Sequence, residues 1–128
     1  MSKVSNKGVY KFWAALRTLA NSRSWKRNLD SDGEIRLYDK DGNEYCPLTA
    51  VYKKLNNEYV DMGQTNIVRD ALKMESVYES RIVGAADDCD SHNKTQQRLR
   101  NKMIKVLKLK KKNEQFLKNE KESEETGW

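Results

Sequence analysis

Apolar residues between positions 9 and 20 recur with the period of an α-helix. Their spacing places them on one helical face: Val9, Phe12, Trp13, Leu16, Leu19 and Ala20. Lys11 falls on the opposite face, so the segment is amphipathic. We therefore predict a helix over 9–20 that ends near Asn21-Ser22 and packs its apolar face into a core.

The apolar period then changes to two. Ile35 and Leu37 alternate with polar neighbours, as in a strand with one buried face. The outward positions of that strand are Glu34, Arg36 and Tyr38. Asp41-Gly42 supplies a tight turn, because glycine takes a positive φ without steric cost, and Tyr45 follows on a second strand. This pattern predicts a β-hairpin.

Helical patterns fill most of the remaining chain. Pro47 suits the first position of a helix, where its missing N–H has no partner to lose. The predicted buried stripe of this helix is Leu48, Val51, Tyr52 and Leu55. A short helix is predicted within 60–74, and another over 76–87 with Gly84 in its middle. The inward residues of the latter are predicted to be Val77, Tyr78, Ile82, Val83 and Ala86. The last helix follows Asn93, with Leu99, Met103, Val106 and Leu107 on its apolar side.

Together these patterns predict an α+β fold that is mostly helical. A small two-stranded β-hairpin packs against four or five helices, and a charged C-terminal extension follows. We expect residues 1–8 to be a flexible N-terminus and 9–109 to form a single compact domain. Beyond position 109 the apolar pattern decays, so 110–128 is expected to be a charged tail, either a fraying extension of the last helix or disordered.

Composition narrows the class of protein. The chain has 128 residues, 37% of them hydrophobic and 34% charged, which is enough apolar material for one small core. Two cysteines do not make a disulfide framework, and neither a signal peptide nor a spanning segment is apparent. The net charge of +6 favours anionic partners. We expect no membrane association and no cofactor; the pattern does not indicate an oligomeric state.

The last helix carries the strongest candidate for a binding surface. Nine Lys or Arg residues, and no acidic one, fall between Asp90 and Glu114. The residues expected to bind a nucleic acid or another partner are Lys94, Arg98, Lys102, Lys105, Lys108 and Lys112. Such a face neutralises phosphates in a salt-dependent way. The simpler interpretation is the solvated outer face of a packed helix.

Two further segments suggest nucleic-acid contacts less directly. Trp25 stands among cations, so it either stacks a base or plugs the edge of the core, and we favour the plug. Residues 66–87 have the length of a helix-turn-helix. However, the turn lacks glycine, and Glu79 stands where a residue that contacts bases is expected.

Catalytic and metal-binding patterns are sparse. Cys46 precedes a helix, where the helix dipole would stabilise a thiolate, and His92 could act as its base with Asp87 or Asp90 orienting the imidazole. The simpler interpretation is a buried thiol and a loop histidine, so we expect no enzyme activity. Cys46, Cys89 and His92 lack the paired spacing of a zinc site. The DKDGNE run lacks the bidentate glutamate of a calcium loop.

Three stretches resemble a group of small uncharacterised proteins of tailed phages and prophages: GEIRLYDKDGNEYCPLTAV, RIVGAADDCDSH and RLRNKMIKVLKL. The resemblance covers roughly 25–109 and implies a viral accessory protein that acts in the host cytoplasm. It implies no activity, so no site residue follows from it. We expect a non-enzymatic protein that binds a host or phage macromolecule, either a protein or a nucleic acid. The alternatives are nucleic-acid binding by the last helix and a thiol enzyme using Cys46 and His92.

Overall fold

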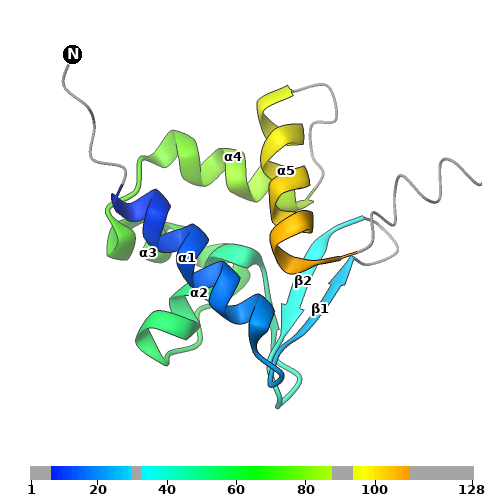
Figure 1. Cartoon of the computed structure of the whole chain (residues 1–128). Coiled ribbons are helices and arrows are strands. Elements are labelled where there is room, and N and C mark those ends of the chain that lie inside the picture. The colour runs from blue at the N-terminus through cyan, green and yellow to red at the C-terminus, as the bar shows by residue number, and fades with distance from the viewer. Residues whose placement is uncertain (1–6, 30–32, 88–93, 110–128) are drawn as a thin grey trace, which may run out of the picture.

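A computed structural model describes residues 7–29, 33–87 and 94–109 (Figure 1). Within these ranges it contains five α-helices, a short 3₁₀ turn at Met62–Gln64 and a three-stranded antiparallel sheet. The elements are α1 (Lys7–Asn21), β1 (Lys26–Leu29), β2 (Ile35–Tyr38), β3 (Glu44–Tyr45), α2 (Pro47–Asn56), α3 (Thr65–Leu72), α4 (Ser76–Asp87) and α5 (Lys94–Leu107). The predicted α+β class is confirmed. None of the helices in the described ranges is long and apolar enough to cross a membrane.

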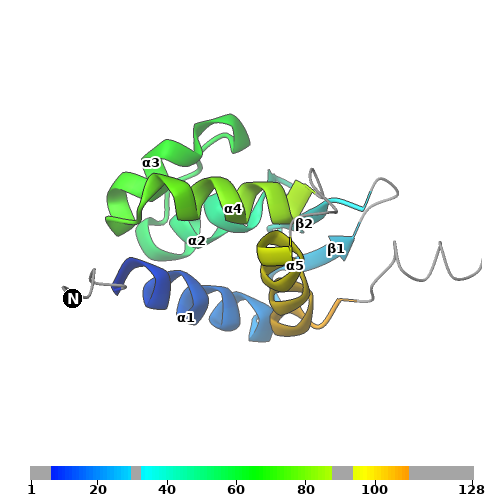
Figure 2. The same cartoon turned by 90° about the horizontal axis from the view of Figure 1, so that it is seen from above.

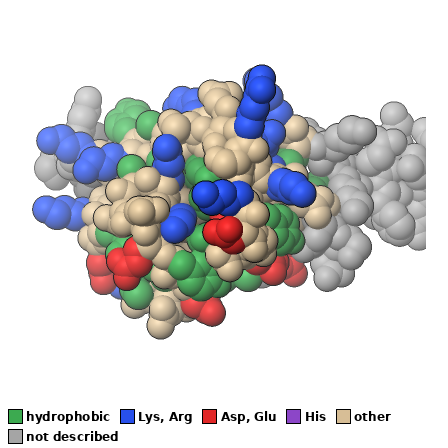
Figure 3. Space-filling view, turned by 90° about the horizontal axis from the view of Figure 1, so that it is seen from below, with side chains coloured by type: hydrophobic (Ala, Val, Ile, Leu, Met, Phe, Trp, Pro, Cys, Tyr) green, Lys and Arg blue, Asp and Glu red, His purple; other side chains and the backbone are tan. Residues whose placement is uncertain are grey.

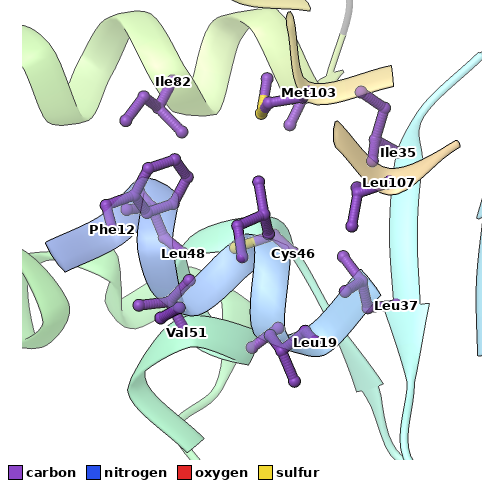
Figure 4. Packing of buried hydrophobic residues seen from close by; sticks show 14 of the residues in the cluster. Phe12, Leu19, Ile35, Leu37, Cys46, Leu48, Val51, Ile82, Met103 and Leu107 are labelled. Atoms are coloured by element: carbon purple, nitrogen blue, oxygen red, sulfur yellow. The ribbon is translucent and has the colours of Figure 1, made fainter. Parts of the chain in front are cut away.

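The core forms where the apolar face of α1 meets the other elements. Phe12 of α1 is fully buried, as are Leu48 of α2, Ile82 of α4 and Met103 of α5. Figure 4 shows these side chains, with Leu37 of β2, converging from five elements into one cluster. Truncating a buried phenylalanine to alanine typically costs about 3–5 kcal/mol of stability. This cluster therefore contributes much of the stability of the folded state.

The sheet has one strand more than the predicted hairpin. β1 pairs antiparallel with β2, with Lys26 opposite Tyr38 and Leu29 opposite Ile35, and the strand order is β1-β2-β3. The sequence of β1, KRNL, has no alternation of apolar residues, so its extended form follows from pairing with β2. The sheet closes one end of the molecule, as Figure 1 shows.

The turn between β2 and β3 is closed by its own polar groups. The Asp39 carboxylate accepts hydrogen bonds from the backbone N–H groups of Asp41 and Asn43, and from the Tyr45 hydroxyl at 2.7 Å. Partial burial raises the pKa of Asp39, but the hydrogen bonds from Tyr45 and Asn43 outweigh that effect, so the pKa is lowered overall. Gly42 has φ +85°, as predicted for this turn.

Arg36 departs from the predicted alternation of β2. The sequence places it outward, yet the residue is 8% exposed. Its guanidinium pairs with Glu34 and with Asp87 at the end of α4, the latter at 3.1 Å, and Glu44 lies 3.5 Å away. Burial lowers the pKa of Arg36, but the neighbouring Asp87 and Glu34 carboxylates raise it by more. The buried charge is therefore paired, which is the condition under which burial is tolerated.

Helix ends differ from the prediction at several points. α1 begins at Lys7, and Gly8 is buried because the start of α1 packs against the end of α3, so the expected flexible N-terminus does not extend to position 8. Leu55 and Val77, both predicted to face inward, are 49% and 51% exposed. Each lies in a terminal turn of its helix, Leu55 in the last turn of α2 and Val77 in the first turn of α4.

At Gly84, in the middle of α4, the nearest neighbour is a side chain of α5. A β-carbon at this position would lie 2.0 Å from the side-chain Nε2 of Gln96 on α5. Gly84 therefore leaves room for the amide of Gln96 against α4, at the cost of a lower helix propensity than alanine would have.

Candidate functional site

The outer side of α5 carries the predicted basic stripe. Met103, Ile104 and Leu107 are buried against the core, whereas the cations on the opposite side are exposed: Lys94, Arg98, Lys102 and Lys105. This division follows from the helical period, because positions four apart in sequence lie on the same face. Lys108, just beyond the helix, is also exposed. Lys112 lies outside the described residues.

One arginine of α5 does not belong to this stripe. Arg100 is 9% exposed and points inward. It donates to the carbonyl oxygens of Ala85, at 2.9 Å, and of Ala86 and Gly33. Ala85 and Ala86 lie in the last turn of α4, where carbonyl groups lack helical partners and attract cations. Arg100 therefore anchors α5 to the end of α4 and to the chain just before β2.

The end of α5 is sharply defined. Lys108 adopts a left-handed conformation with φ +56°, and the N–H of Leu109 donates to the carbonyl of Ile104 at 2.9 Å. This hydrogen bond is the signature of a Schellman cap. The prediction that the helix continues and frays past Leu109 is therefore wrong at this point. The tail itself, 110–128, lies outside the described residues.

α1 packs beside α5, although the two helices come from opposite ends of the chain. The Nζ atom of Lys102 lies 4.1 Å from the ring centroid of Trp13, a cation–π contact. The indole of Trp13 donates to the Tyr78 hydroxyl of α4 at 3.1 Å. Figures 1 and 2 show the later part of α1 beside α5, whereas the start of α1 lies next to α3. The two helices thus present a shared surface.

Neither helix of this pair contains an acidic residue. The first acidic residue of the chain is Asp30, so α1 and β1 have none, and α5 has none either. We call the exposed cations of the two helices that lie outside the groove described below the α1–α5 face: Lys7, Arg17, Lys94, Arg98, Lys102 and Lys105. The ion pairs formed among the described residues use Arg36 and Arg69, so no carboxylate in these ranges pairs with a cation of this face.

Charge is unevenly distributed on the side of the molecule that Figure 3 shows. Lys and Arg side chains gather over its upper half, and most of the Asp and Glu side chains lie lower.

A groove of about 320 Å³ lies between α1, α2 and α3. It is lined by Lys11, Tyr52, Leu55, Asn56, Ala71 and Leu72. A volume of this size lies at the low end of small-molecule sites.

The thiol site is not supported. Cys46 is buried, and burial raises the pKa of its thiol more than the hydrogen bonds with Thr49 and the nearby Arg36 lower it. The raised pKa and the burial fit the simpler interpretation, a buried thiol, because desolvation outweighs the groups that favour the thiolate. Asp87 pairs with Arg36. Cys89, Asp90 and His92 lie outside the described residues.

The possible helix-turn-helix has the expected two helices, but not the expected surface. Glu79 of α4 is buried and faces α3, where it accepts hydrogen bonds from Thr65 at 2.6 Å and Arg69 at 3.4 Å. It therefore holds the two helices together and does not occupy a base-reading position. The exposed positions of α4 include a single cation, Arg81, which is a poor match to a phosphate-binding helix.

Trp25 packs at the edge of the core, as predicted. The residue is half-buried, and its ring centroid lies 4.9 Å from that of Tyr45, which is fully buried. Tyr59 packs on the same tyrosine with its centroid 5.2 Å away. These contacts cover the edge of the core near the sheet.

Comparison with known proteins gives no family to which the chain belongs. No protein-family model, curated protein or solved structure matches it. The α1–α5 face is therefore interpreted from its own chemistry. Sequence reasoning identified the α5 part of this face and missed the α1 part, although the signal for it, the absence of Asp and Glu before Asp30, was present in the sequence.

Proposed function

We propose that this protein is a non-enzymatic binding protein that holds a nucleic acid on the α1–α5 face. The observation that carries this proposal is the packing of two helices without acidic residues into one surface with six exposed cations. Cationic side chains that replace the counterions of a phosphate backbone provide most of the affinity in sequence-independent binding.

The size of the face fits this ligand. The cations of α5 extend from Lys94 to Lys105, which is roughly 16 Å along a helix that rises 1.5 Å per residue. Duplex DNA carries one charge per about 1.7 Å of its axis, so this stripe alone faces several phosphates. Lys102 is also held in place by Trp13, which reduces the entropy that a flexible lysine loses on binding.

The resemblance to small phage proteins supports a role for this binding in the host cytoplasm. A nucleic acid of the host or phage is then the macromolecule that such an accessory protein would bind. A protein ligand is the alternative, and the groove beside Leu55 is where it would contact the chain. That groove is small, whereas the α1–α5 face is extended, so the nucleic acid is favoured.

The test is a fluorescence anisotropy titration of a labelled oligonucleotide at 50 mM salt. The triple variant K94Q/R98Q/K105Q removes three exposed cations of α5, and we expect a loss of affinity of at least tenfold. The matched control, K40Q/K54Q/R81Q, removes the same charge from exposed positions outside the face. Equal losses in the two variants would show a response to net charge alone and would refute the proposed face.

A further inference from the structure

Tyr10 is the most exposed of the large hydrophobic residues in the described ranges. It is 72% exposed, compared with 49% for Leu55 and Tyr59 and 51% for Val77. Within those ranges it makes no hydrogen bond, ion pair or ring contact. Its side chain therefore contributes little to folding, and the ring is open to solvent.

The surroundings of Tyr10 distinguish it from an ordinary exposed tyrosine. Lys7 precedes it by one helical turn, and Ala14 and Arg17 follow by one and two turns, so all of them lie on the same side of α1. Ala14 has a short side chain that does not cover the ring. Trp13, three residues on, carries Lys102 over its own ring, which places a cation of α5 near this surface.

An open aromatic ring among cations matches the chemistry of a single-stranded nucleic acid. The bases of a duplex are stacked on one another, whereas those of a single strand are free to stack on a protein ring. Positive side chains on both sides of that ring would then hold the flanking phosphates. Among the exposed large hydrophobic residues in the described ranges, Tyr10 is the only aromatic one that lies on a helix without acidic residues.

We propose that the ligand is a single-stranded nucleic acid, with one base stacked on Tyr10 and its phosphates on the adjoining cations of the α1–α5 face. This inference rests on the proposed function and specifies its ligand. Base stacking on an aromatic side chain is worth about 1–3 kcal/mol by alanine substitution. The Tyr10 ring therefore accounts for roughly 5- to 150-fold in affinity for a single strand.

Tyr59 provides a matched control. It is also an exposed tyrosine, but its neighbours Glu58 and Asp61 are acidic, and its ring packs on Tyr45. A base stacked there would bring phosphates close to carboxylates, which repel them. The Y59A variant should consequently bind single strands as the wild type does.

The experiment compares the full chain with Y10A, Y10F and Y59A in anisotropy titrations. The probes are labelled oligothymidylate, oligouridylate and a duplex of the same length. We expect Y10A to lose at least fivefold in affinity for at least one of the single strands and to keep its affinity for the duplex. Y10F, which keeps the ring, and Y59A should match the wild type. Thermal unfolding of each variant checks that the fold is unchanged.

The outcomes separate this inference from the proposed function. If K94Q/R98Q/K105Q weakens binding but Y10A does not, the stacking inference is overturned and the basic face stands. Tighter binding of the duplex than of either single strand also overturns the inference. If no oligonucleotide binds the wild type and a protein partner is captured instead, both proposals fail.

Discussion

Replacing Arg100 with methionine tests whether this cation is part of the scaffold or of the binding surface. Methionine keeps much of the length and apolar character of the side chain but removes the charge and the hydrogen-bond donors. In the native structure these donors reach the carbonyls of Ala85, Ala86 and Gly33 from a buried position. The substitution therefore leaves carbonyl groups at the end of α4 without this partner.

The loss of stability expected for R100M follows from these hydrogen bonds. A hydrogen bond that involves a charged group contributes about 1.5–3 kcal/mol, and two of the three contacts share one nitrogen of Arg100. Relief from burying a charge offsets part of the loss. We expect R100M to lower the free energy of unfolding by about 2–4 kcal/mol, or roughly 10–25 °C in Tm for a domain of this size.

The neighbouring Arg98 supplies the control. It lies on the same helix but is exposed, so R98M should change the free energy of unfolding by less than about 0.5 kcal/mol. Urea unfolding followed by tryptophan fluorescence measures both variants. A loss below about 0.5 kcal/mol in R100M, or an equal loss in R98M, would refute the assignment of Arg100 to the scaffold.

Three further substitutions test local features of the structure. G8A should reduce stability despite the higher helix propensity of alanine, because its β-carbon would lie 2.2 Å from the carbonyl oxygen at the end of α3; an unchanged or raised Tm would contradict this packing. In a C89S background, Cys46 should resist a thiol reagent at pH 8 in the folded state and react on unfolding, since burial raises its pKa; rapid labelling of the folded protein would revive the thiol hypothesis. Asp39 has a lowered pKa in the folded state, so it contributes stability above its unfolded pKa of about 4, and this contribution is lost as the pH falls through the folded pKa. D39N should therefore flatten the acid limb of the stability profile measured from pH 2 to 6, and an unaltered limb would exclude this role.

The elements that were predicted correctly are those whose own residues show a clear helical or turn pattern. The helix periods of α1 and α5 and the turn at Gly42 are local signals, and the structure confirms them. β1 was missed because its strand form depends on the pairing with β2. Its four residues, KRNL, show no period of their own.

Charged residues on inner faces account for a second group of errors. A period analysis places every charge outside, so it cannot find Arg36 or Arg100, whose burial depends on partners from distant segments. The same limit applies to the candidate site. The stripe on α5 follows from one helix, whereas the contribution of α1 depends on the contact between Trp13 and Lys102, residues separated by most of the chain.

The central claim is that α1 and α5 act as one surface for nucleic acid, and the salt dependence of binding tests it most directly. The slope of log K against log salt concentration for a single strand falls by about 0.7 for each phosphate contact removed. The variant K7Q/R17Q removes two cations of α1 and leaves α5 unchanged. We expect its slope to be shallower than that of the wild type by about 1.4. A slope equal to that of the wild type would show that α1 takes no part in binding and would contradict the claim.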